Sequence, residues 1–67
     1  MTVTKARGII KQYRLQARVA AEADVTPQAV SLVFNGHRKS AKIDSVTVSE
    51  AEKVEESLAM AKRWSRS

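Results

Sequence analysis

Hydrophobic positions recur at helical spacing in the first third of the chain, and they predict two short helices with one apolar face each. The first stripe predicts a helix over residues 5–14 and consists of Ala6, Ile9, Ile10 and Tyr13. The second stripe predicts a helix over residues 16–23 and consists of Val19, Ala20 and Ala23. Because two of these three residues are alanines, another helix can approach this face closely.

The next segment carries a helix stop, a helix start and a third apolar stripe. Asp24 tolerates the left-handed conformation that a tight turn requires, Thr26 suits the N-cap position and Pro27 suits the first helical turn. Gly36 is a natural residue to end the helix that follows. We expect its buried face to comprise Ala29, Val30, Val33 and Phe34. The positions left for solvent or a partner are Gln28, Ser31, Leu32 and Asn35.

The pattern changes after Gly36. Residues 37–49 show no helical stripe but contain several β-branched side chains, so we expect a loop with a short extended segment near residues 45–48 that could pair with a second chain. Ser49 and Glu52 form a capping-box pattern at the start of a helix over residues 50–64. We expect this helix to cover the preceding helices with its apolar stripe, which comprises Ala51, Val54, Leu58 and Ala61. We also expect the last third of the chain to provide a dimer contact. The predicted fold is therefore a compact all-α domain of four helices.

Composition and charge narrow the possible functions. A chain of 67 residues can enclose one core only, so residues 1–67 are expected to form a single domain. There is no cysteine, no visible signal peptide and no run of about 20 apolar residues, which favours a cytoplasmic protein over a secreted or membrane-spanning one. Residues 1–42 carry eight basic and two acidic side chains, whereas residues 43–67 carry four and five. The net charge of +5 therefore comes from the first two thirds of the chain, and it favours an anionic partner.

Two short helices, a tight turn and a basic exit form the shape that enters the major groove of DNA. The segment QARVAAEADVTPQAVSLVFNG, residues 16–36, resembles the helix-turn-helix of the Cro and phage-repressor group, whose fold is lambda-repressor-like. Residues 19–36 are also similar to the headpiece of the lac-repressor family. In these families the turn is commonly Gly, an apolar residue and then Ser or Thr, and here Asp24 replaces the Gly. The resemblance covers about a third of the chain closely, and an amphipathic helix ahead of it favours the Cro group.

The resemblance implies a small repressor from a phage, prophage or plasmid that binds an operator in double-stranded DNA as a homodimer in the bacterial cytoplasm, at the nucleoid. By matching positions, it implies that base edges are contacted by Pro27, Gln28, Ser31 and Leu32. Gln pairs well with adenine and Leu with a thymine methyl group, whereas Pro at the first position reads no base by hydrogen bonding. The expected phosphate contacts come from Gln16, Arg18, Thr26, Asn35, His37, Arg38 and Lys39.

Each assignment has an alternative that the sequence leaves open. Gln28 and Ser31 are equally compatible with solvated helix positions, Leu32 with a place in the core, and His37 with an ordinary surface residue. At the level of function, the alternatives are an excisionase-like or architectural protein that bends DNA, and an antitoxin or other protein-interaction module. The sequence offers no nucleophile with its base, no metal cluster and no phosphate-binding loop, so we expect no enzyme, cofactor, metal ion or small-molecule effector.

Overall fold

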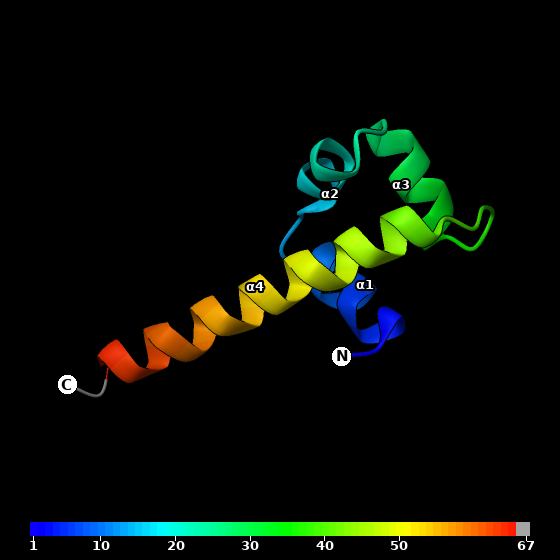
Figure 1. Cartoon of the computed structure of the whole chain (residues 1–67). Coiled ribbons are helices and arrows are strands. Elements are labelled where there is room, and N and C mark those ends of the chain that lie inside the picture. Colours follow the sequence, from blue (N-terminus) through cyan, green and yellow to red (C-terminus); the bar gives the residue numbers. More distant parts are fainter. Residues whose placement is uncertain (66–67) are drawn as a thin grey trace.

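Four helices make up the domain, and none of residues 1–65 forms a strand. The computed structural model describes the backbone of residues 1–65 and the side chains of residues 1–62. Helix α1 spans Val3–Gln12, α2 spans Gln16–Ala23, α3 spans Pro27–Phe34 and α4 spans Ala41–Ser65. The predicted all-α, four-helix class is confirmed. In Figure 1, α4 is the long axis of the molecule, and the three short helices gather around its first half.

The apolar faces of the helices meet in one core. Helix α4 packs on α1 and on α2, and α3 packs mainly on α2. The side chains enclosed are Ala6, Ile10, Val19, Ala20, Ala23, Val30, Val33, Phe34, Ile43 and Ala51. The predicted core positions of α2 are all buried, and those of α3 are buried except Ala29, which is half-buried. Tyr13 was expected in the core and is instead 42% exposed, because α1 ends before it.

Local signals explain where the three short helices begin and end. The Thr2 hydroxyl accepts a hydrogen bond from the Lys5 amide, so α1 starts two residues earlier than predicted. At its other end Arg14 takes a left-handed conformation with φ 56°, and the Leu15 amide donates back to the Ile10 carbonyl at 2.9 Å. This closing pattern is a Schellman motif, and it explains why the helix predicted over residues 5–14 ends at Gln12.

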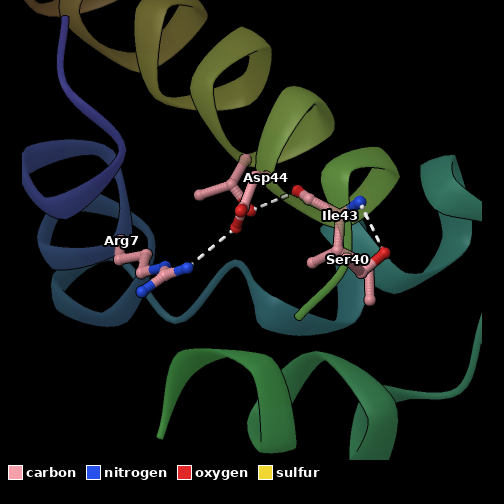
Figure 2. A network of polar contacts seen from close by, with 5 residues as sticks. Arg7, Ser40, Ile43 and Asp44 are labelled. Carbon is pink, nitrogen blue, oxygen red and sulfur yellow. Dashed lines mark hydrogen bonds and ion pairs between the residues drawn. The ribbon is translucent and has the colours of Figure 1, made fainter. Parts of the chain in front are cut away.

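The extended segment expected near residues 45–48 is wrong, as is the helix start at Ser49. Helix α4 begins at Ala41, where the Ser40 hydroxyl accepts a hydrogen bond from the Ile43 amide at 3.3 Å. Asp44 in the first turn receives the Arg7 guanidinium of α1 at 2.9 Å, which ties the start of α4 to α1 (Figure 2). The β-branched Thr47 fits the helix because its hydroxyl donates to the Ile43 carbonyl at 2.7 Å.

The second half of α4 does not cover the other helices as expected. Figure 1 shows it running past α1 and α2, and the molecule measures 45 × 20 × 17 Å along its principal axes. Of its predicted apolar stripe, Ala51 is buried and Val54 is half-buried. Leu58 is 42% exposed and Ala61 is also exposed. The helix therefore supports the core with its first half only.

Candidate nucleic-acid interface

The turn between α2 and α3 is formed by Asp24, Val25 and Thr26. Asp24 is left-handed, with φ 57° and ψ 46°, and the Val25 amide donates to the Ala20 carbonyl at 2.9 Å. This Schellman motif ends α2, and the half-buried Val25 packs against the core. The Thr26 hydroxyl then accepts a hydrogen bond from the Ala29 amide at 3.2 Å, which starts α3. The predicted turn and helix start are both confirmed, and they fix the direction of α3 relative to α2.

Helix α3 has one buried face and one outward face. Val30, Val33 and Phe34 point into the core. Pro27, Gln28 and Asn35 are exposed, and Ser31 is half-buried. The side chain of Leu32 is 37% exposed, so its alternative placement in the core is wrong. The predicted base-reading residues therefore share one outward face, which we call the α3 face and define as Pro27, Gln28, Ser31, Leu32 and Asn35.

Two polar side chains of the α3 face are hydrogen-bonded to each other. The Asn35 side-chain amide donates to the Ser31 hydroxyl at 3.4 Å, one helical turn apart. The contact uses one lone pair of the Ser31 oxygen. The hydroxyl hydrogen of Ser31 is not used in this contact, and the side-chain carbonyl oxygen of Asn35 can accept a hydrogen bond from a partner. Gln28, at the start of the same face, presents an exposed amide with two donors and one carbonyl acceptor.

A basic loop follows the α3 face directly. Gly36 has φ 80°, and the His37 amide donates back to the Leu32 carbonyl at 2.9 Å, so α3 ends in another Schellman motif. Past this turn His37, Arg38 and Lys39 are all exposed. Lys42, in the first turn of α4, is exposed as well. We call these four residues the exit loop cluster. Lys42 was missing from the predicted site, since the start of α4 was mistaken for a loop.

The two predicted phosphate contacts on α2 lie in different surroundings. Gln16 is half-buried at the first position of α2, next to the orphan amides of the helix N-terminus. The Arg18 side chain is directed to α4, where its Nε donates to Glu50 Oε2 at 3.1 Å. Glu50 is almost fully buried, with a side-chain exposure of 5%, and it also accepts from Lys53 Nζ at 3.2 Å. Arg18 thus connects α2 to α4, and the α3 face is not part of that contact.

Other chemistries find little support in the described part of the chain. Among residues whose side chains are placed, no three His, Cys, Asp or Glu side chains gather as metal ligands would. No helix within residues 1–65 combines the length and the apolar character that crossing a membrane requires. Neither a protein-family model, nor a curated protein, nor a solved structure matches this chain significantly, so the assignment of a function depends on its own geometry and charges.

Proposed function

We propose that the protein is a sequence-specific double-stranded DNA-binding regulator that inserts α3 into the major groove. The observation that supports this proposal is the α3 face, an outward row of hydrogen-bonding and apolar side chains. The opposite side of the same helix is buried in the core. The major groove admits one α-helix, and it displays the donors, acceptors and methyl groups that Gln and Leu side chains recognise. The resemblance of residues 16–36 to Cro and phage-repressor helix-turn-helix segments supports the same proposal.

The exit loop cluster provides the second part of the binding surface. It places a histidine and three cations immediately beyond the C-terminal end of α3, where the chain leaves the helix. Contacts from such residues to phosphates hold a recognition helix in register without reading sequence. Gln16 and Thr26, at the N-termini of α2 and α3, add positions where backbone amides face an anion favourably. Because one short helix reads few base pairs, we expect two copies on a two-fold operator with half-sites about 34 Å apart.

In the cell, such binding would repress transcription where the operator overlaps a promoter, and the protein would act in the bacterial cytoplasm at the nucleoid. The test is selection from a random double-stranded DNA pool at about 150 mM salt, a concentration that suppresses nonspecific phosphate binding. The proposal predicts enrichment of a two-fold motif. Retention of DNA without any motif would favour an architectural protein, and absence of retention would contradict DNA binding and favour a protein-interaction module.

Two substitutions separate base contacts from phosphate contacts. Gln28→Ala is expected to cost about 1–3 kcal/mol on the selected operator and to relax the preference at one base pair, because the exposed amide is lost. Arg38→Ala is expected to weaken binding to all sequences and to lower the slope of log K against log salt by about one. Fluorescence anisotropy on operator and scrambled duplexes measures both. An equal loss on the two duplexes for Gln28→Ala would remove this residue from the base contacts.

A further inference from the structure

The apolar face of α4 continues beyond the core. At Ile43, Thr47 and Ala51 this face is buried against the other helices. The same stripe runs on from Ala51 through Val54, Leu58 and Ala61 in steps of three, four and three residues, and the last two of these residues are exposed. A spacing that averages 3.5 residues is the pattern by which two helices pack side by side along a seam. We call residues 54–62 the projecting segment of α4 (Figure 1).

A groove lies beside the start of the projecting segment. It has a volume of about 300 Å³, and its apolar walls are Val54 and Leu58 of α4 together with Tyr13 and Leu15 from the connection between α1 and α2. Tyr13 and Leu58 are both 42% exposed. The groove and the apolar stripe thus form one continuous surface, which begins between the helices and ends on the projecting segment.

The molecule exposes more surface than a compact monomer of its mass. A compact monomer of 7.4 kDa exposes about 4,200 Å², whereas this structure exposes 4953 Å². Its radius of gyration is 12.8 Å, compared with about 11 Å for a compact chain of this length. The excess of about 750 Å² follows from the elongated shape, in which α4 extends beyond the other helices.

The charges along α4 indicate which partner fits. Glu52, Glu55 and Glu56 precede Leu58, whereas Lys62 follows it, and the sequence continues with Arg63 and Arg66. A second copy of this helix running in the opposite direction would place its basic end beside the acidic residues of the first. On a helix of 3.6 residues per turn, Glu55 and Lys62 lie on the same side of the apolar stripe. Glu55 forms an ion pair with Lys5 of its own chain at 3.7 Å, and both side chains of this pair are largely exposed. Antiparallel pairing about a two-fold axis would add Lys62 of the other copy beside the same carboxylate, once at each end of the seam.

We propose that the projecting segments of two copies pair antiparallel, with the seam formed by Val54, Leu58 and Ala61 and its edges by Glu55 of one copy and Lys62 of the other. In this arrangement each partner helix passes beside Val54 and Leu58, which line the groove of the opposite copy. A parallel pair is disfavoured, because Tyr13 and Leu15 stand on the same side of α4 as the stripe and the two globular parts would collide. The interface is isologous, and it leaves the α3 face of each copy outside.

The test is sedimentation equilibrium of the full chain without DNA, over concentrations from about 1 μM to 1 mM. The proposal predicts a dimer, and a monomer throughout this range would overturn it. Leu58→Glu is expected to weaken association at least thirtyfold, because it places a charge at the centre of the seam. The matched control is Met60→Glu, which introduces the same charge two residues further, about 160° around the helix from Leu58 at a position that is 52% exposed, and is expected to leave association unchanged. Equal effects of the two variants would refute the seam. Circular dichroism of each variant checks that the exposed substitution leaves the helices intact.

A charge exchange tests the direction of the helices. Glu55→Lys and Lys62→Glu are each expected to weaken the dimer about tenfold, since each creates like charges at both ends of the seam, and the double variant is expected to restore it. Within one chain these positions are two helical turns apart, so restoration requires contact between copies. Failure of the double variant to recover would overturn the antiparallel arrangement. Because no DNA is present, these results are independent of the proposed DNA binding.

Discussion

Asp24 occupies a left-handed position, with φ 57°, that a glycine would adopt at lower cost. A residue with a Cβ atom pays about 1–2 kcal/mol for this conformation. Replacement by Gly removes that cost. It also makes the unfolded chain more flexible, which lowers the free energy of unfolding by about 0.5–1 kcal/mol. Asp24→Gly is therefore expected to raise the free energy of unfolding by about 0.5–1 kcal/mol. In a domain of this size this corresponds to an increase in Tm of about 2–8 °C.

Thermal and urea unfolding, followed by circular dichroism, measure the effect, and two further variants isolate its cause. Asp24→Ala also removes the negative charge from the C-terminus of α2 but keeps the Cβ atom, so it is expected to be less stable than Asp24→Gly by about 1 kcal/mol. Gly36→Ala is the reverse experiment, because Gly36 has φ 80° and an added Cβ atom meets nothing within 4 Å. The strain of the left-handed backbone is opposed there only by the lower flexibility of the unfolded chain, and a net loss of about 1 kcal/mol is expected.

The reasoning would be refuted if Asp24→Gly were no more stable than the original chain while Gly36→Ala lost stability. In that case the Asp24 side chain would contribute to the turn in its own right. The result also concerns the proposed DNA contact, because this turn sets the direction of α3. If the turn geometry is retained, Asp24→Gly should leave the affinity for the selected operator unchanged.

Three further substitutions test the helices and their packing by the same unfolding measurements. Glu50→Gln is expected to lower the free energy of unfolding by about 1–2 kcal/mol, because the almost buried carboxylate accepts charged hydrogen bonds from Arg18 and Lys53. If stability at low salt were unchanged, the ion pair between Arg18 and Glu50 would add nothing to the packing of α2 on α4. Ser45→Ala is expected to stabilise by about 0.5 kcal/mol, since Ser45 is exposed within α4, and a destabilisation would speak for an extended segment instead. Gly8→Ala is expected to stabilise by about 1 kcal/mol, because a Cβ atom there has open space inside α1; a loss would indicate a contact that the structure lacks.

The parts of the fold that were predictable from the sequence are those that depend on neighbouring residues. Thr26 and Pro27 start a helix, and Gly36 ends it, through hydrogen bonds within a few positions along the chain. The inward positions of α2 and α3 follow from spacing alone. For the candidate site, the same local logic placed Gln28 on the outward face, opposite the buried stripe, whereas it left Leu32 between the core and the surface until the structure showed it exposed.

The start of α4 was not predictable in this way, because its causes lie far apart in the sequence. Residues 43–48 are rich in β-branched side chains, which favour strands by propensity. They are helical because Ile43 and Thr47 face the core at helical spacing and because Arg7, at the other end of the chain, binds Asp44. The ion pair between Arg18 and Glu50 depends on the same helix. Because residues 37–49 were predicted to be a loop, neither the ion pair between Arg18 and Glu50 nor the position of Lys42 could be predicted.

The placement of α4 also decides where an anionic partner can approach. The exit loop cluster adjoins the first turn of α4, whereas four of the seven acidic residues of the chain, Glu50, Glu52, Glu55 and Glu56, lie in the middle of this helix, where its second half begins. Figure 1 shows that second half extending away from α3. DNA would therefore be attracted to the end of the molecule that carries the exit loop cluster and repelled from the middle of α4, because both effects are strong within a Debye length of about 10 Å. Replacing Glu52 and Glu56 by Gln should thus increase nonspecific DNA affinity only slightly, whereas Lys39→Gln and Lys42→Gln should each reduce it clearly. If the glutamate and the lysine substitutions changed the nonspecific affinity by similar amounts, the net charge, and not its position on the fold, would control DNA association.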